Sequence, residues 1–316
     1  MSSYDALLIV SFGGPEKRED VIPFLENVLR GRNVPRERML AVAEHYYNFD
    51  GRSPINDQNR ALIEALRPAV KIPIYWGNRN WHPLLADTVH QMQGDGIRHA
   101  VAFVTSAFGS YSGCRQYIED IDRARGPLRI DKIRPFSGHP KFIQAMTERV
   151  GAALTELPQG RLVFTAHSVP LSMAESSPYV SELERACAAV ARGVGRDAWK
   201  LVYQSRSGPP TQPWLEPDIG DYLREIRSDV VIVPIGFLSD HMEVLYDLDT
   251  EARAVCDGLG VKMVRAGTVG IHPAMIEMIA EMVTLEHDQD HSMCAEGCCA
   301  VPRRPVASGL KAGPTT

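Results

Sequence analysis

Three segments of the chain carry side chains that can bind a cation or accept a proton, and each of them follows a short apolar run. They are Ser11–Pro15, His167–Pro170 and Gly236–Glu243. In parallel sheets, ligands bind beyond the carboxyl ends of the strands. We therefore expect these three segments to line one site, and we analyse their chemistry together.

His167 ends the apolar run Leu162–Ala166, and Pro170 turns the chain directly after it. A neutral imidazole at the end of a strand can accept a proton or bind a metal ion. A hydrogen-bonded core histidine would give the same local pattern, and this segment alone does not separate the two interpretations.

The third segment continues into an acidic stretch. Its carboxylates are Asp240, Glu243, Asp247, Asp249 and Glu251. Glu243, Asp247 and Glu251 are four residues apart, so they share one broad face of an α-helix, and a π-helical turn would align them more closely. Such a row suits a hydrated divalent cation or a proton relay. The alternative is that these carboxylates form a solvated stripe on the protein surface. Apolar residues between positions 244 and 248 leave the helix no freely exposed polar side, which favours the functional interpretation.

Eight apolar runs, separated by amphipathic stretches, must position these segments. The runs are Ala6–Phe12, Ile72–Trp76, Ala100–Thr105, Leu128–Ile133, Leu162–Ala166, Lys200–Tyr203, Val230–Ile235 and Val261–Val264. They are continuous rather than alternating, which is typical of strands buried on both faces of a parallel sheet. The helical pattern Pro140–Leu154 separates four runs from four. The sequence therefore predicts an α/β fold with two similarly built halves, residues 1–150 and 151–285.

Two further stretches are irregular. Gln204–Pro217 contains four prolines, too many for a helix or a central strand, and we expect a functional loop or lid there. Helical periodicity stops after about Thr284, which leaves residues 286–316 as a C-terminal extension. We expect residues beyond about 303 to be disordered.

Composition excludes several classes of protein. The 316 residues are 44% hydrophobic and 23% charged, as in a folded soluble protein. The net charge of −5 and the lack of a long basic run argue against a nucleic-acid partner. No apolar stretch approaches the roughly 18 residues of a membrane span, so we expect a cytoplasmic protein. The motifs of dinucleotide oxidoreductases, P-loop kinases, zincins and α/β-hydrolases are absent.

Four motifs carry a resemblance to the ferrochelatases of heme biosynthesis over roughly residues 5–285. They are LIVSFGGP at 8–15, GRSP at 51–54, TAHSVP at 165–170 and PIGFLSDHMEVLYDLD at 234–249. The resemblance implies a lyase that inserts Fe(II) into a metal-free porphyrin. It also implies two Rossmann-like domains, each with a four-stranded parallel sheet flanked by helices, that enclose a porphyrin cleft.

The resemblance implies roles for the polar residues of the second half. His167 and Glu243 match the catalytic pair of the family. Metalation must remove two pyrrole protons while a dehydrated cation is delivered, which requires a base and metal ligands on one side of the ring. We expect His167 to be proton acceptor and metal ligand, Glu243 to be second ligand or proton carrier, and Asp247 and Glu251 to relay protons toward solvent. His241 is a further candidate, for orienting Glu243.

Residues of the first half match the wall of the porphyrin pocket. Ser53 and Tyr117 correspond to positions that hold porphyrin carboxylates in the relatives that make coproheme, and Arg52 and His45 are additional donors. Ordinary loop capping is the alternative for each of them. Phe12 stands where many bacterial relatives have a tyrosine. A phenyl ring stacks on the macrocycle but does not ligate iron.

The substrate is expected to be coproporphyrin III, because the sequence most resembles the actinobacterial type. Protoporphyrin IX is the alternative substrate. A cobalt or nickel chelatase on the same fold is a second alternative, and a porphyrin or metal carrier without turnover is a third. The sequence does not indicate an oligomeric state.

Three cysteines crowd into the C-terminal extension, namely Cys294, Cys298 and Cys299. Some ferrochelatases carry a [2Fe-2S] cluster on such an extension, held by three tail cysteines and one internal cysteine, and the resemblance implies the same here. Cys114 is the expected fourth ligand because it lies in a predicted loop after a strand, whereas Cys187 and Cys256 fall inside amphipathic helical patterns. A structural zinc ion or a ligand-free tail are the alternatives.

Overall fold

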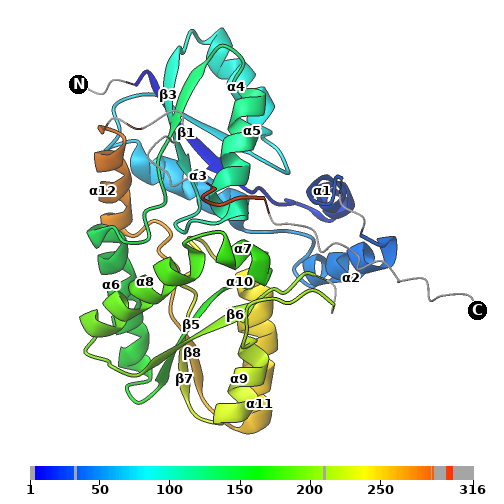
Figure 1. The fold of residues 1–316 in the computed structure, drawn as a ribbon, viewed down its shortest axis with the longest axis vertical. Helices are drawn as coiled ribbons and strands as arrows, with labels where there is room; N and C mark the ends of the chain where they lie inside the picture. Colours follow the sequence, from blue (N-terminus) through cyan, green and yellow to red (C-terminus); the bar gives the residue numbers. More distant parts are fainter. Residues whose placement is uncertain (1–3, 32–33, 209–210, 286, 288–296, 302–316) are drawn as a thin grey trace, which may run out of the picture.

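The computed structural model describes residues 4–31, 34–208, 211–285, 287 and 297–301. Two four-stranded parallel sheets lie in the two halves of the molecule (Figure 1), with orders β2-β1-β3-β4 and β6-β5-β7-β8. The strands are β1 (Ala6–Ser11), β2 (Ile74–Asn78), β3 (His99–Val104), β4 (Arg129–Lys132), β5 (Arg161–His167), β6 (Trp199–Gln204), β7 (Val230–Val233) and β8 (Met263–Arg265). All eight predicted strands are present, and the predicted fold class is confirmed.

Helices flank both sheets. They are α1 (Val21–Val28), α2 (Arg36–Tyr47), α3 (Ile55–Leu66), α4 (Leu85–Gly94), α5 (Gln116–Ala124), α6 (Pro140–Glu156), α7 (Leu171–Glu175), α8 (Tyr179–Gly193), α9 (Ile219–Ile226), α10 (Met242–Val244), α11 (Arg253–Leu259) and α12 (Pro273–Met282). A 3₁₀ turn, η1, covers Arg18–Asp20, and two π-helical segments cover Tyr111–Arg115 (η2) and Leu245–Ala252 (η3).

The two sheets share one topology. In each, the chain starts at an inner strand, adds one edge strand, and then returns to the other side of the first strand. The order therefore reverses between β1 and β3 in the first sheet and between β5 and β7 in the second. In open parallel sheets a ligand crevice forms at this point, beyond the carboxyl ends of the strands. The segments that follow β1, β5 and β7 are those that the sequence singled out.

The hydrophobic core joins the two halves. One buried cluster contains Phe103 of the first sheet, Phe164 of the second and Phe142 of α6, all without solvent exposure. Helix α6 begins where Pro140 predicted, with the His139 ring accepting a hydrogen bond from the backbone N–H of Lys141. Helix α12 packs against both α3 and α6 (Figure 1). The two halves, which are expected to enclose the cleft, are therefore joined by a shared buried cluster and by the packing of α12 against α3 and α6.

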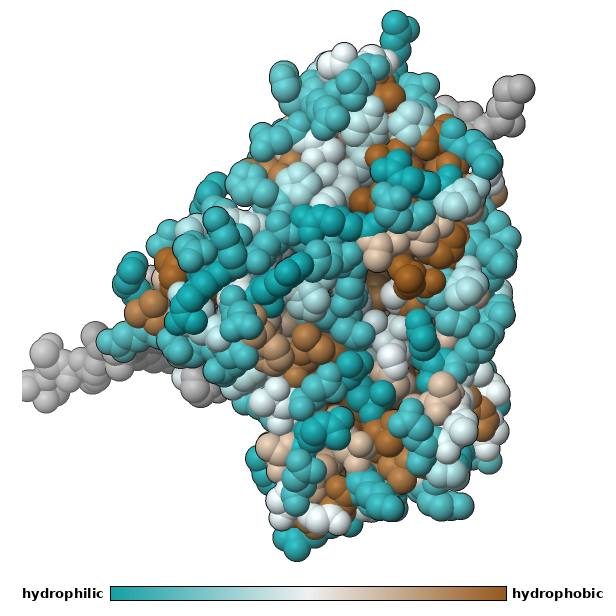
Figure 2. Space-filling view, turned by 180° about the vertical axis from the view of Figure 1, so that it is seen from behind, coloured by the Kyte–Doolittle hydropathy of each residue, from teal (hydrophilic) through white to brown (hydrophobic). Residues whose placement is uncertain are grey.

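Polar side chains cover most of the back face of the molecule, and apolar residues form only small separate areas (Figure 2). Within the described ranges, no helix is both long enough and apolar enough to cross a membrane.

Gln204 ends β6, and the described residues from 205 to 217 form no helix or regular strand, as predicted. It is tied to the second half by short bridges from Trp214 to Pro170 and from Asp218 to Tyr203. Residues 209–210 of this segment, the tail beyond about residue 303 with its predicted disorder, and Cys294 lie outside the described residues.

Candidate active site

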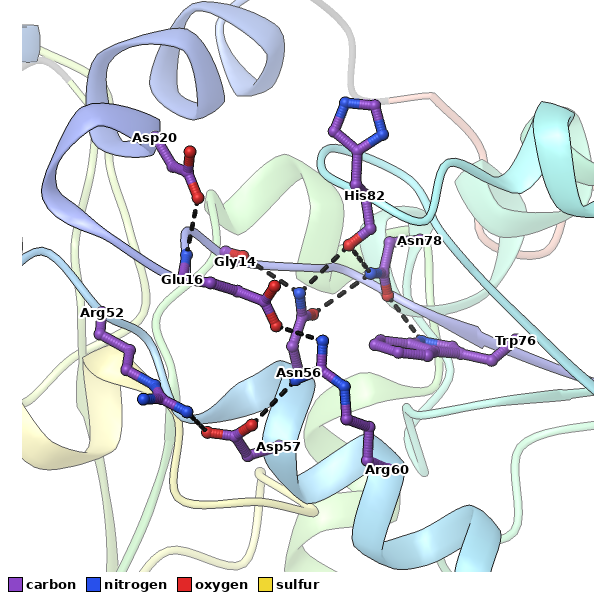
Figure 3. Close-up of polar contacts among 10 residues, drawn as sticks. All are labelled: Gly14, Glu16, Asp20, Arg52, Asn56, Asp57, Arg60, Trp76, Asn78 and His82. Carbon is purple, nitrogen blue, oxygen red and sulfur yellow. Dashed lines mark hydrogen bonds and ion pairs between the residues drawn. The ribbon is translucent and has the colours of Figure 1, made fainter.

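The loop after β1 is held by a network of buried amides (Figure 3). Asn78, at the end of β2, donates to Asn56 Oδ1 at 3.2 Å, and Asn56 Nδ2 donates to the carbonyl of Gly14 at 3.3 Å. Gly13 has φ +81°, and a Cβ there would lie 2.8 Å from the Cβ of Asn78, so only glycine fits the turn. A Cβ at Gly14 would lie 2.7 Å from Ser53 Cβ. The first loop is thus packed tightly against the start of α3.

Three of the predicted porphyrin-binding residues lie around this loop. Ser53 is buried, and its N–H donates to the carbonyl of Pro15 at 2.8 Å. Arg52 is exposed and pairs with Asp57, which is also exposed. Phe12 has 38% of its surface accessible to solvent, and the edge of its ring meets Phe24. An exposed aromatic ring at the end of a central strand is available to an incoming flat ligand.

His45 lies on α2, which contacts the second half. Its ring stacks on Tyr246 with 3.9 Å between centroids and 12° between planes. Arg38, on the same helix, donates to the carbonyl of Ser207 at 2.6 Å in the irregular segment after β6. Helix α2 therefore joins the two halves beside the site.

Tyr117 is buried on α5 rather than open to solvent. The Arg79 guanidinium lies over its ring, 4.5 Å from the centroid, and pairs with Asp120. Burial raises the pKa of the Tyr117 hydroxyl, and the nearby Arg79 opposes this shift. Arg79 was not predicted from the sequence. Arg79 directly follows β2, so it lies at the carboxyl edge of the first sheet, where ligands bind. An arginine directly after an apolar run was the available signal.

His167 ends β5 as predicted, and its ring faces Glu243. Its Nδ1 lies 2.5 Å from the carbonyl oxygen of Ser168, which only accepts hydrogen bonds, so Nδ1 carries the proton. Nε2 is then free to accept, and it lies 3.8 Å from Glu243 Oε2. The buried Tyr179 donates to the carbonyl of His167 at 3.0 Å. The histidine and the glutamate, separated by 76 positions in the sequence, are brought together.

Gly236 explains why the loop after β7 reaches His167. Its N–H donates to the carbonyl of Thr165 at 3.1 Å. A Cβ at Gly236 would lie 2.7 Å from the Cα of Ala166, so a side chain would push the loop away from β5. This close approach delivers Glu243 to the end of the neighbouring strand.

His241 orients Glu243 through the backbone. Its Nδ1 accepts a hydrogen bond from the Glu243 N–H at 3.2 Å and caps the short helix α10. Burial lowers the pKa of His241, which favours the neutral ring that can accept this bond. The orienting role expected for His241 stays a prediction.

The acidic row continues on a π-helix, η3, the geometry that would align it best. Burial raises the pKa of Asp247 to about 7, and the neighbouring carboxylates of Glu243 and Glu251 act in the same direction. Ser205 Oγ donates to Asp247 Oδ2, and Gln204 Nε2 lies 3.3 Å from the same oxygen. Burial and the neighbouring carboxylates thus bring the pKa of Asp247 to a value at which its carboxyl group can gain and lose a proton near neutral pH.

Gln204 and Ser205, like Arg79, were not predicted from the sequence. Gln204 ends β6 and pairs in register with His167, so it lies at the same sheet edge. Its Nε2 also donates to the carbonyl of Glu243 at 3.2 Å. A polar residue at the end of an apolar strand was the available signal.

Arg265 and Gln58 brace the loop that carries Glu243, and neither was predicted. Arg265 ends β8 and donates to Asp240 at 2.8 Å and to Asp249 at 2.7 Å. Gln58 reaches across from α3. Its amide donates to the carbonyl of Asp240 at 2.9 Å and accepts from the Asp240 N–H at 2.8 Å.

The predicted loop around Cys114 is wrong, because Tyr111–Arg115 forms the π-helix η2. Ser110 caps it by accepting from the Gly113 N–H at 2.9 Å. Cys114 is buried there, so its placement depends on this turn rather than on an open loop.

The C-terminal segment returns to Cys114, between α5 and α7 (Figure 1). The Cys299 N–H donates to the carbonyl of Ser176 at 3.0 Å, and its thiol lies within hydrogen-bonding reach of Cys114. The sulfurs of Cys298 and Cys299 are 3.6 Å apart. Cys187 and Cys256 lie buried in α8 and α11, as expected. Across the described part of the chain, no three His, Cys, Asp or Glu side chains are arranged to hold a metal ion.

Two sheets of equal strand order, with polar loops at their carboxyl edges, define a two-domain chelatase fold. SirB from Bacillus subtilis has this fold, with a TM-score of 0.54 and 13% identity over 88% of this chain and 93% of that one. CbiX, a terminal enzyme of siroheme biosynthesis, matches with a TM-score of 0.53 and 16% identity over 88% and 97%. At these identities the likeness concerns the fold alone.

The family itself follows from the sequence comparisons. The profile of the ferrochelatase family matches residues 4–287, and the chain belongs to that family, whose members are lyases that insert iron into porphyrins. The ferrochelatase of Rhodopirellula baltica is 49% identical over 97% of this chain and 96% of its own length. The coproporphyrin III ferrochelatases of Frankia alni and Streptomyces coelicolor are 48% and 46% identical, over 95% and 98% of this chain and 87% and 96% of their own lengths.

Proposed function

We propose that this ferrochelatase inserts Fe(II) into coproporphyrin III and releases coproheme. The observation that carries the chemistry is the His167–Glu243 pair, with an available Nε2 3.8 Å from a carboxylate at the carboxyl ends of the central strands. The choice of porphyrin is supported by relatives that are named coproporphyrin III ferrochelatases at 42–49% identity. Protoporphyrin IX is the alternative substrate.

In the proposed reaction, the porphyrin loses two pyrrole N–H protons and gains one Fe²⁺, so two protons must leave the site. His167 Nε2 accepts the two pyrrole protons one after the other, since its Nδ1–H is engaged by Ser168. The Glu243 carboxylate stabilises the imidazolium and takes the proton onward. Asp247, with its pKa raised to about 7, passes the proton to Glu251 and solvent.

The same side chains serve the metal. Because Nε2 has a single lone pair, we propose that His167 and Glu243 hold Fe(II) on one side of the macrocycle before Nε2 accepts a pyrrole proton. Asp247 and Glu251 lie along the approach of the cation. An imidazole and carboxylates suit a divalent iron, and a row of exchangeable carboxylates lets the cation shed water in steps. Iron is a substrate here.

The porphyrin carboxylates need cationic or hydroxyl donors on the first half. We assign Arg52, Ser53, His45 and Tyr117 to them, with Phe12 stacked on the macrocycle. The Arg52–Asp57 pair is exposed on both sides, so a propionate can displace Asp57 at the small cost typical of surface pairs. Tyr117 lies beneath Arg79, which places a guanidinium beside the hydroxyl.

The test is anaerobic Fe(II) insertion into coproporphyrin III and protoporphyrin IX, measured side by side. We expect kcat/KM to be at least about tenfold higher for coproporphyrin III, equal to roughly 1.4 kcal/mol of transition-state binding. A higher value for protoporphyrin IX contradicts the assignment. Parallel assays with Zn(II), Co(II) and Ni(II) test the chelatase alternatives. Binding of porphyrin without turnover of any metal would indicate a carrier.

We also propose that Cys114, Cys294, Cys298 and Cys299 hold a [2Fe-2S] cluster. In this proposal the chain consists of two halves, 1–150 and 151–285, and a C-terminal extension, 286–316, that supplies three of the four cluster ligands. The proposal is supported by the proximity of the described thiols: the sulfurs of Cys298 and Cys299 are 3.6 Å apart, and the Cys299 thiol lies within hydrogen-bonding reach of Cys114. Thiolates are the ligands of this cluster, which supplies a one-electron redox centre when bound.

The visible spectrum and the iron and sulfide content of anaerobically purified protein test the cluster. We expect charge-transfer absorption and about two irons and two sulfides per chain. Protein without iron or sulfide contradicts the proposal, and one equivalent of zinc instead indicates a structural zinc site.

A further inference from the structure

Two aromatic rings from opposite halves of the molecule are stacked beside the proposed site. His45 lies in the last turn of α2, and Tyr246 lies on η3, one residue before Asp247. The ring centroids are 3.9 Å apart, and the ring planes differ by 12°. Both side chains are half-buried. A parallel stack of this kind fixes the plane of the imidazole, so its edge, where both nitrogens lie, is presented beside the tyrosine ring.

The nitrogen atoms of His45 are available to a ligand. Neither of them has a hydrogen-bond partner among the described residues. A neutral imidazole carries one N–H donor, and the charged ring carries two, so the ring can donate to a carboxylate in either state. His45 is therefore a donor whose plane is held by a neighbour while its hydrogen-bonding edge stays free.

The other three donors that we assign to the porphyrin carboxylates are held within the first half. Ser53 is packed against the loop after β1, Tyr117 lies beneath Arg79, and Arg52 pairs with a carboxylate of α3. His45 differs from them, because the ring that holds it belongs to the second half. Its orientation therefore depends on how the two halves are packed.

The end of α2 that carries His45 lies close to the reactive groups of the second half. Burial raises the pKa of the hydroxyl of Tyr46, the next residue, and the charge of Glu243 raises it further. At the other end of α2, Arg38 donates to the carbonyl of Ser207 at 2.6 Å. Helix α2 thus contacts the second half at two places, beside the acidic row and beside the segment after β6.

We propose that Tyr246 is a positioning residue for porphyrin recognition, its ring holding the imidazole of His45 so that an N–H can donate to a carboxylate of the substrate. The inference rests on the proposed function, in which His45 binds a porphyrin carboxylate. A donor that is oriented before the substrate arrives loses less side-chain freedom on binding, and hydrogen bonds to a charged acceptor are stronger than neutral ones. The carboxylate site of the first half is then completed by a residue of the second half.

The experiment measures the Kd of metal-free coproporphyrin III by fluorescence quenching in the full chain. His45→Phe keeps an aromatic ring in the stack but removes both nitrogens, and we expect it to raise Kd about tenfold. Tyr246→Leu removes the stack but keeps the imidazole, and we expect it to raise Kd about three- to fivefold. Tyr246→Phe, which restores the ring, is expected to bind as the wild type does. Tyr222→Leu, at a half-buried tyrosine on α9, is the matched control.

The double variant His45→Phe/Tyr246→Leu tests whether the two residues act together. We expect its Kd to equal that of His45→Phe, because the stack has no donor left to position. In Fe(II) insertion assays the same variants should raise KM for the porphyrin more than they lower kcat.

Three results would overturn the role of Tyr246. They are a wild-type Kd in His45→Phe, which would mean that the stack only joins the halves, a wild-type Kd in Tyr246→Leu, and effects that multiply in the double variant. Tyr246→Gln replaces Tyr246→Leu if the leucine variant does not fold. A wild-type protein that prefers protoporphyrin IX contradicts the proposed substrate instead, and the same cycle measured with protoporphyrin IX then decides the role of Tyr246.

Discussion

At the scale of single residues, the tautomer of His167 decides what the site can do. The Ser168 carbonyl accepts from Nδ1 and leaves Nε2 as a base that faces Glu243. The backbone of His167 is itself held by the buried Tyr179. The imidazole is therefore oriented before substrate binds, which lowers the reorganisation needed at the moment of proton transfer.

Replacement of His167 with alanine removes this base. We expect His167→Ala to lower kcat for Fe(II) insertion by about 10³-fold, within the range for loss of a general base, and to change the Kd of porphyrin by less than about threefold. Steady-state insertion assays and fluorescence quenching of the porphyrin measure the two quantities. His90→Ala, at an exposed position on α4, is the control. Substantial turnover in His167→Ala contradicts the assignment.

Asp247 predicts a pH dependence. Its pKa is raised to about 7 chiefly by burial, so the carboxyl is protonated below pH 7 and becomes able to accept a proton as the pH rises through 7. We expect kcat to rise across this range in the wild type and to lose that step in Asp247→Asn, with a plateau about 10²-fold lower. Asp257→Asn, at an exposed position on α11, is expected to keep the wild-type profile. The same inflection near pH 7 in Asp247→Asn shows that another group titrates.

At the scale of elements, the sequence predicted those features that depend on local pattern. Continuous apolar runs predicted all eight strands, and the spacing of Glu243, Asp247 and Glu251 predicted one broad helical face, which the structure forms as the π-helix η3. The π-helix around Cys114 was not predicted, because it depends on the cap from the Ser110 side chain to the Gly113 N–H rather than on a periodic pattern of apolar residues.

Contacts across long sequence distances carry no local signal. Gln58 looks like an ordinary polar residue on an amphipathic helix, yet it bonds to both backbone groups of Asp240, 182 residues away. Arg265 ends a short edge strand, and its position in the sequence does not indicate that it binds Asp240 and Asp249. Only the packed structure shows that these side chains fix the loop bearing Glu243.

Gln58→Met is expected to loosen that loop. The change removes two hydrogen bonds across the halves while keeping the side-chain length, at a cost of about 1–2 kcal/mol. We expect kcat to fall about tenfold, since Glu243 is less often in place, and KM for porphyrin to stay within about twofold. Gln144→Met is the control, because among the described residues the Gln144 side chain bonds only to Glu148 of its own helix. A raised KM with unchanged kcat would instead make Gln58 a substrate contact.

At the scale of the whole molecule, the two halves repeat one topology, and each has a buried cluster of its own beside one that they share. Both sheets contribute to a single buried cluster, and α6 and α12 pack across its base. On the opposite side, α2 reaches the second half through the His45–Tyr246 stack. We therefore expect porphyrin to enter without separation of the halves, because separation would expose the shared core.

Phe142 tests whether the halves unfold together. It is fully buried on α6, and its ring meets Phe108 and Phe136 of the first half at centroid distances of 6.1 and 6.0 Å, in the same cluster as Phe164 of β5. We expect Phe142→Ala to lower the free energy of unfolding by about 3–5 kcal/mol. Hydrogen exchange should accelerate equally in β1 and β5, because one cooperative unit loses stability. Val202→Ala, in a cluster confined to the second half, is the control for a local effect. Faster exchange in one sheet only, or two calorimetric transitions, would show that the halves are independent and that the cleft can open by their separation.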